Sequence, residues 1–127
     1  MLGMGIIMVG VLILAHGSKR QGAEELLDSI ISKVKQKTGL KLVYPAYYQF
    51  SEQNLETGID CLIKEGAETI KVIPMFLFDG NHVNIDIPRE IDNFKKKYPN
   101  IKITISKHLG DDERIAEIVA DRIKSVD

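Results

Sequence analysis

Four short apolar segments alternate with four amphipathic, helix-like segments along this chain, and this alternation constrains the fold most strongly. The apolar segments are expected as strands at about residues 10–15, 41–48, 69–77 and 101–105. The first is apolar throughout, which is typical of a strand covered on both faces. Strands that alternate with helices predict a parallel sheet joined by right-handed crossovers. We therefore expect one α/β layer structure, a four-stranded parallel sheet flanked by helices.

The helix-like segments have recognisable start and stop signals. Gly39 and Gly66 are expected to end the first two helices, and Asp86 to act as N-cap of the third with Pro88 in its first turn. Pro74 should stand near the end of its strand or at a bulge, because it cannot donate to the ladder. Apolar residues at helical spacing are expected on the core-facing sides: Ala23, Leu26, Leu27, Ile30, Ile31, Val34; Leu55, Ile59, Leu62, Ile63; Ile87, Ile91, Phe94, Tyr98; and Ile115, Ile118, Val119, Ile123.

The chain length of 127 residues fits a single domain that can bury a core without disulfides. We expect residues 9–127 to form that domain and residues 1–8 to be an N-terminal extension. The apolar start has no basic segment of the kind that opens a signal peptide, and glycines interrupt it too early for a membrane span. A cytoplasmic protein without membrane association is expected.

Charge and cysteine content exclude other classes. The 17 basic and 18 acidic residues leave a net charge of −1, so there is no electrostatic case for nucleic-acid binding. Cys61 is the one cysteine, which rules out an intrachain disulfide and a cysteine-based zinc cage. We interpret Cys61 as a small apolar residue on a helix.

Two histidines follow the ends of apolar segments. His16 comes directly after the first expected strand, and His82 closes the polar turn after the third. Ligands of open parallel sheets bind in the crevice outside the carboxyl ends of the strands. Imidazoles titrate near neutral pH and bind borderline metals, so His16 and His82 point to metal handling, proton transfer or both.

Other residues in the same loops have two readings each. Gly17 permits a tight turn or a close ligand approach, and Phe76–Phe78 either line a pocket for a flat ring or pack in the core. Glu52 either caps the second helix electrostatically or faces the crevice. We treat a third histidine, His108, as incidental. Three basic residues lie near the two histidine loops: Lys19, Arg20 and Arg89. Each is expected either to be exposed to solvent or to contact substrate.

Several familiar catalytic motifs do not occur. The chain has no Gly-x-Gly-x-x-Gly, no P-loop and no Gly-x-Ser-x-Gly elbow around Ser18. Histidine phosphatases place Arg before the His-Gly pair that follows a strand, whereas Ala15 stands there in this chain. A phosphate-ester enzyme built on His16 is therefore disfavoured.

Taken in order, the segments of this chain resemble the class II chelatases. The resemblance is greatest to small single-domain members, the short CbiX-type sirohydrochlorin cobaltochelatases and the related nickel chelatases. The segments that carry it are Leu12–Ser18 (LILAHGS), Phe50–Glu52 (FSE), Val72–Leu77 (VIPMFL), Gly80–Val83 (GNHV), Asp86–Arg89 (DIPR) and Leu109–Asp112 (LGDD).

The resemblance implies a flavodoxin-like chelatase fold and an ATP-independent lyase without organic cofactor. Such an enzyme inserts Co²⁺, or alternatively Ni²⁺ or Fe²⁺, into sirohydrochlorin in cobalamin or other tetrapyrrole biosynthesis. It implies that His16 is proton acceptor and metal ligand, and that His82 is the second ligand or base. The implied tetrapyrrole contacts are Glu52, Leu77, Phe78, Asp79, Gly80, Asn81 and His82.

Three further points qualify this resemblance. Gln49 stands where many relatives carry an acidic residue. A homodimer is expected, because one small domain offers a large flat substrate only one wall. The alternative from another class is a non-catalytic carrier of metal or tetrapyrrole, which would use His16 and His82 in the same way.

Overall fold

The computed structural model describes residues 7–19, 22–49, 51–78, 80 and 85–127. Strands and helices alternate as the sequence predicts: β1 (Val9–Ala15), α1 (Ala23–Thr38), β2 (Leu42–Tyr47), α2 (Leu55–Lys64), β3 (Thr69–Pro74), α3 (Ile87–Lys97), β4 (Lys102–Ile105) and α4 (Glu113–Lys124).

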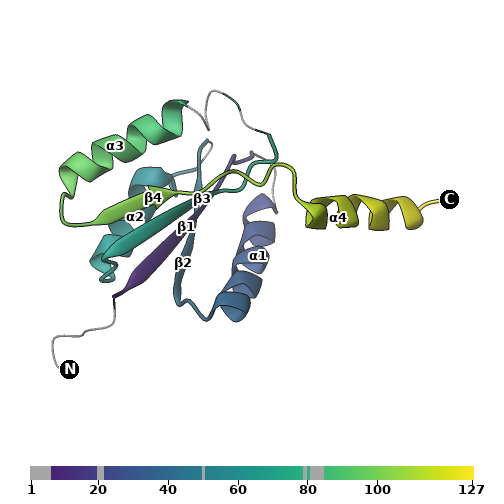
Figure 1. Ribbon diagram of the computed structural model, residues 1–127, viewed down its shortest axis with the longest axis horizontal. Coiled ribbons are helices and arrows are strands. Elements are labelled where there is room, and N and C mark those ends of the chain that lie inside the picture. The colour runs from purple at the N-terminus through teal and green to yellow at the C-terminus, as the bar shows by residue number, and fades with distance from the viewer. Residues whose placement is uncertain (1–6, 20–21, 50, 79, 81–84) are drawn as a thin grey trace.

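The four described strands form one parallel sheet in the order β2-β1-β3-β4 (Figure 1). β1 and β3 are neighbours at the centre, and β4 is an edge strand. Because all strands are parallel, their carboxyl ends meet at one edge of the sheet. We call the loops along this edge the carboxyl rim; it comprises residues 16–19, 48–54, 75–80 and 106–112 as far as they are described.

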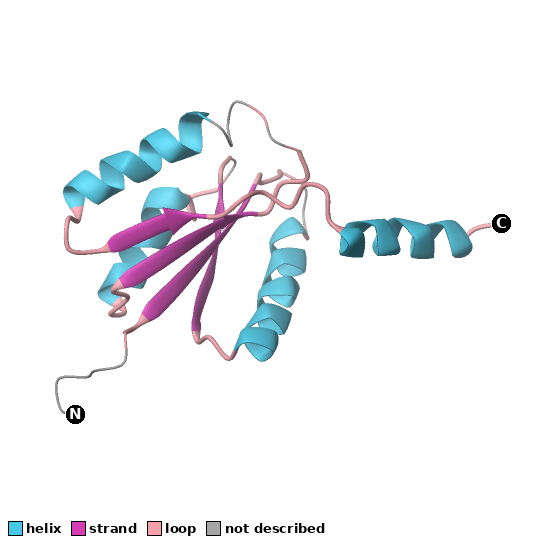
Figure 2. Cartoon of the chain, viewed as in Figure 1, coloured by secondary structure: helices cyan, strands magenta, loops and turns pink. Residues whose placement is uncertain are grey.

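Helices cover the two faces of the sheet unequally: α1 lies on one side, and α2 and α3 on the other (Figure 2). The α1 side holds the smaller buried cluster: Val11, Ile13, Leu27, Ile31, Val43 and Tyr47. The opposite side holds the larger one, built around residues such as Leu12, Leu14, Ile59, Ile70, Ile87 and Ile103. A hydrogen bond from the Tyr98 hydroxyl to Asp60 Oδ1, 2.6 Å long, ties the end of α3 to α2.

The start of the chain joins the sheet earlier than expected. The backbone carbonyl of Met8 accepts hydrogen bonds from the amides of Glu68 (2.8 Å) and Thr69 (3.3 Å), so Met8 belongs with the folded domain although its side chain is exposed. Residues 1–6 of the predicted extension lie outside the described residues. In the part of the chain that is described, no helix has the length and apolar character needed to cross a membrane.

Three local predictions differ from the structure. β3 ends at Pro74 rather than at Leu77: Pro74 has no N–H to donate to a neighbouring strand, and the Met75 amide makes one further bond, to the Leu14 carbonyl over 2.8 Å. Asp86 precedes α3 but does not cap it through its side chain. Its backbone is already helical, and its carboxylate instead accepts a hydrogen bond from the Tyr48 hydroxyl. Leu26 was predicted to face the core, yet its side chain is 64% exposed on α1.

The largest correction concerns α4, which was predicted to pack into the compact layer. The helix instead extends away from the sheet (Figure 1), and none of its residues, all of them described, is buried. Its start is well defined, because Asp112 accepts a hydrogen bond from the backbone amide of Arg114 and pairs with that guanidinium. Helical periodicity identified the helix correctly, but periodicity cannot say which surface the apolar side covers.

Candidate functional site

His16 lies at the point of the carboxyl rim where the connections from the sheet diverge. It is the first residue after β1, and its side chain is exposed. Its ring meets the ring of Phe76, just past β3, edge to face, with centroids 5.9 Å apart and planes at 78°. The chain leaves β1 toward β2 on one side while β3 lies on the other, so His16 occupies the switch point at which such sheets bind ligands.

Gly17 allows the loops after β1 and β2 to touch. The Gln49 amide donates to the His16 carbonyl over 2.9 Å, which continues the pairing of the two strands beyond their ends. Gly17 has φ +96°, and a Cβ atom there would lie 2.0 Å from the Gln49 carbonyl oxygen. Only glycine fits this position, so the predicted tight turn after His16 has a steric cause. The contact also holds Gln49 next to His16 at the rim.

A group of tyrosine and carboxylate side chains lies beside Gln49 and was missed by sequence reasoning. Burial, followed by the carboxylates of Asp86 and Glu90 and a hydrogen bond from the hydroxyl to Asp86, raises the pKa of Tyr48. Burial and then the charge of Asp86 raise the pKa of Glu90. Tyr48, Gln49 and Glu90 line one cavity of about 370 Å³. The only sequence signal was the like-charged pair Asp86 and Glu90, four residues apart at a helix start.

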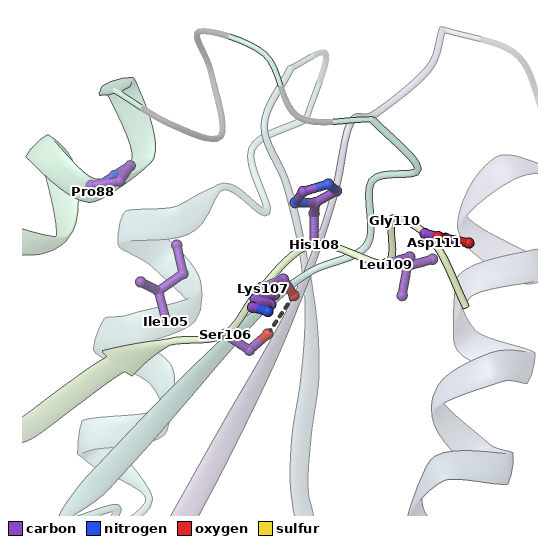
Figure 3. Close-up of a pocket in the computed structure, with 8 residues that line it drawn as sticks. All are labelled: Pro88, Ile105, Ser106, Lys107, His108, Leu109, Gly110 and Asp111. Atoms are coloured by element: carbon purple, nitrogen blue, oxygen red, sulfur yellow. Dashed lines mark hydrogen bonds between the residues drawn. The ribbon is translucent and has the colours of Figure 1, made fainter. Parts of the chain in front are cut away.

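His108 lies in a second hollow of the rim (Figure 3), although sequence reasoning treated it as incidental. A cavity of about 520 Å³ runs here between the start of α3 and the loop after β4. The imidazole of His108 projects above the strand ends and is half-buried. Gly110 beside it has φ +59°, and a Cβ atom there would lie 3.2 Å from His108 Nε2. The backbone bond from the Leu109 amide to the Phe76 carbonyl, 2.9 Å, fastens this loop to the loop after β3.

Two predicted tetrapyrrole contacts share this region with His108. Leu77 and Phe78 are 47% and 80% exposed, and together with His108 and Ile115 they line a further cavity of about 410 Å³. Their exposure contradicts the core-packing reading and favours an apolar lining for a flat ligand.

Those of the remaining predicted residues that the structure describes are not brought into one cluster. Glu52 is exposed, and Asn54 rather than Glu52 caps α2 by accepting from the Thr57 amide. Gly80 is exposed at the rim. Lys19 and Arg89 are exposed as well, and among the described residues no three His, Cys, Asp or Glu side chains are placed to share a metal ion. The other predicted residues, Arg20, Asp79, Asn81 and His82, lie outside the described residues.

Fold and rim together define an open-sheet α/β domain with a histidine at its ligand-binding switch point. Within that class, residues 10–126 match the CbiX family, and the chain belongs to this family.

Two relatives illustrate how the chain compares with known proteins. It is 35% identical to a sirohydrochlorin cobaltochelatase of Saccharolobus solfataricus, over 91% of this chain and 94% of that one. It is 31% identical to the chloroplastic sirohydrochlorin ferrochelatase of Arabidopsis thaliana, over 91% of this chain but 51% of that one. The chain thus spans about half the length of several of the relatives it matches, including sirohydrochlorin ferrochelatase of Bacillus subtilis, of which it covers 44%.

Solved structures agree with the fold. The sirohydrochlorin chelatase SirB from Bacillus subtilis subspecies spizizenii, in complex with cobalt, superposes with a TM-score of 0.86 at 29% identity, over 93% of this chain and 50% of SirB. A CbiX protein of Marinobacter aquaeolei VT8 superposes with a TM-score of 0.77 at 23% identity, over 92% of this chain and 93% of that one, and supports the fold alone. The predicted four-stranded chelatase-like domain is confirmed.

Proposed function

We propose that this chain is a sirohydrochlorin chelatase that inserts a divalent metal ion, with His16 as a proton acceptor and metal ligand. The observation that carries the proposal is the position of His16, exposed at the switch point of the sheet in a member of the CbiX family. Relatives named cobaltochelatase and ferrochelatase support the reaction and leave the metal open.

The chemistry requires a base and a transient metal ligand at the same place. Metal insertion exchanges the N–H protons of two pyrrole rings for one divalent ion among four nitrogens. A neutral imidazole can accept a proton near pH 7 and can hold a borderline metal ion. The edge-to-face contact with Phe76 places the His16 imidazole at the crevice that substrate would enter.

Substrate would lie over the apolar part of the rim. Leu77 and Phe78 offer exposed apolar surface, with His108 beside them. The peripheral carboxylates of sirohydrochlorin can pair with exposed cations of the rim, for which Lys19 and Arg89 are the described candidates.

Three further roles complete the proposal. His82 enters from the sequence alone, as second ligand or base. Glu52 and residues Asp79–Asn81 likewise remain predicted contacts. Glu90, whose pKa is raised by burial and then by the charge of Asp86, provides a carboxyl group in the cavity that Gln49 also lines.

We propose Co²⁺ as the metal, in line with the relative named cobaltochelatase that matches along nearly its whole length. Ni²⁺ and Fe²⁺ are the alternatives, because imidazole ligands suit all three ions and their availability decides among them. The metal is a substrate, and we propose no organic cofactor and no ATP. A cytoplasmic location and a homodimer, in which the second copy supplies the other wall of the substrate cleft, also remain predictions.

An anaerobic assay of sirohydrochlorin with Co²⁺, Ni²⁺ and Fe²⁺ in turn, followed by absorption, tests the proposal. We expect the protein to accelerate insertion of at least Co²⁺ over many turnovers, His16→Gln to lose most of the rate, and Lys37→Ala, far from the rim, to keep it. Equal rates with and without protein for all three metals would reject the enzyme. Conversion that stops near one equivalent would establish the carrier alternative instead.

A further inference from the structure

His108 presents an imidazole at the carboxyl rim that its own chain does not use. Among the residues that the structure describes, none forms a hydrogen bond or an ion pair with this ring. The side chain is half-buried and projects above the strand ends (Figure 3). An imidazole has at least one N–H donor, and a half-buried donor without a partner costs free energy that a ligand group can recover. The ring is therefore suited to contact a bound molecule.

Two hollows of the rim meet at His108. Its side chain lines the cavity of about 520 Å³ next to the start of α3 and also the cavity of about 410 Å³ that Leu77 and Phe78 line. The end of the ring that carries Nε2 lies beside Gly110, where a Cβ atom would be only 3.2 Å away. Leu77 and Phe78 are 47% and 80% exposed. His108 thus stands at the edge of the exposed apolar surface that these two residues form.

The order of the strands determines how His108 lies relative to His16. His16 follows β1 and His108 follows β4, and β3 lies between these two strands. Neighbouring strands are about 4.8 Å apart, so the ends of β1 and β4 are separated by about 10 Å. The loop after β3 fills this interval, since the Phe76 ring contacts His16 and the Phe76 carbonyl accepts from the Leu109 amide. A flat macrocycle centred over His16 therefore has its periphery at His108.

We propose that His108 binds a peripheral carboxylate of the tetrapyrrole, which makes its hollow a carboxylate subsite at the edge of the substrate. The inference rests on the proposed chelatase function, because that function makes a carboxylate-rich macrocycle the substrate. Hydrogen bonds between an imidazole and a carboxylate are charge-assisted and strong. Leu77 and Phe78 contact the apolar ring, and His108 holds one edge of it in register with His16.

The charges around His108 leave its imidazole as the directional contact. Lys107 and Asp111 line the same cavity, and their opposite charges offset each other. The carboxylate of Asp112 is already paired with the guanidinium of Arg114 over 2.7 Å. Neither the cavity nor its surroundings therefore presents a strong net charge of its own, and the N–H groups of His108 select the carboxylate.

Titration of the protein with metal-free sirohydrochlorin, followed by absorption under anaerobic conditions, tests the subsite. His108→Leu keeps a side chain of similar size without N–H donors, and it should raise the Kd for sirohydrochlorin and the KM for insertion by about tenfold. The rate at saturating substrate should not change, because the contact lies at the edge of the ring. His108→Arg restores N–H donors and should bind like the wild type. Lys37→Leu, which removes a positive charge at the last turn of α1, is the matched control.

A second probe shows whether the group that His108 binds is a carboxylate. Conversion of the peripheral carboxylates to primary amides keeps the ring and removes its negative charge. The difference in Kd between the wild type and His108→Leu should then fall below about threefold. An undiminished difference would overturn the proposal. So would an unchanged Kd in His108→Leu, or equal losses in His108→Leu and His108→Arg.

The outcomes separate this subsite from the proposed function. A wild type that binds sirohydrochlorin but inserts no metal rejects the chelatase, while the comparison of Kd values still decides on His108. A wild type that binds no sirohydrochlorin overturns both. Circular dichroism should show the same fold in all variants, because the His108 ring has no bond to the described chain that a substitution could break.

Discussion

Gly17→Ala is the substitution whose effect can be worked out most directly from the structure. The added Cβ atom would stand 2.0 Å from the Gln49 carbonyl oxygen, a backbone atom that no rotamer change can move. Relief requires the loops after β1 and β2 to separate by about 1 Å, since non-bonded contacts need at least about 3 Å. That movement breaks the 2.9 Å bond from the Gln49 amide to the His16 carbonyl.

The expected loss of unfolding free energy has separate contributions. Placing alanine at positive φ costs about 1–2 kcal/mol, and the broken backbone bond with its unpaired groups costs about 1–3 kcal/mol. The lower conformational entropy of the unfolded chain with alanine offsets about 0.4–1 kcal/mol of this loss. The net loss should be about 2–4 kcal/mol, and insertion activity should fall as well, because His16 is displaced relative to Phe76.

Gly22→Ala is the control that separates the cost of positive φ from the cost of the steric contact with Gln49. Gly22 has nearly the same conformation, φ +94°, but nothing lies within 4 Å of the position that its Cβ would take. Urea unfolding should therefore show Gly22→Ala destabilised by about 1 kcal/mol and Gly17→Ala by about 2 kcal/mol more. If both variants have equal unfolding free energies and full activity, the close contact between the loops does not position His16.

Other predictions concern protons and packing. His16→Ala and His82→Ala should each lose most of the insertion rate, and the double variant should be scarcely slower than either. The reason is that both imidazoles would bind the same metal ion, so removing either one disables the same step. Steady-state rates in which the two losses add up would contradict a shared step. The raised pKa of Glu90 means that its charged form destabilises the folded state at any pH above the ordinary carboxyl pKa. Glu90→Gln should therefore raise the melting temperature at pH 7, and this gain should vanish by about pH 4. An equal gain at both pH values would exclude this cause. Tyr98→Phe should lower the unfolding free energy by about 1 kcal/mol through loss of the hydrogen bond to Asp60, and an unchanged urea midpoint would show that this bond contributes nothing.

The sequence by itself determined the alternation of elements, the parallel sheet and the location of His16. These follow from local patterns: the apolar run of β1, the helical spacing on α1 to α4, and the obligatory crossover between parallel strands. The ordered motifs likewise led to the CbiX family, which the match over residues 10–126 confirms. The sequence also placed Pro74 near the end of its strand, because the missing backbone N–H is a property of that residue alone and needs no tertiary contact to recognise.

Only the tertiary structure decided which surfaces meet. It brought Gln49 against Gly17, set Glu90 beside Tyr48, and placed His108 in a hollow with Phe78, and each contact joins residues far apart along the chain or in different elements. The same limit explains α4, whose apolar side was predicted correctly while its partner was not. Periodicity reports that a side of a helix is apolar, but the surface that covers it depends on where the chain goes next.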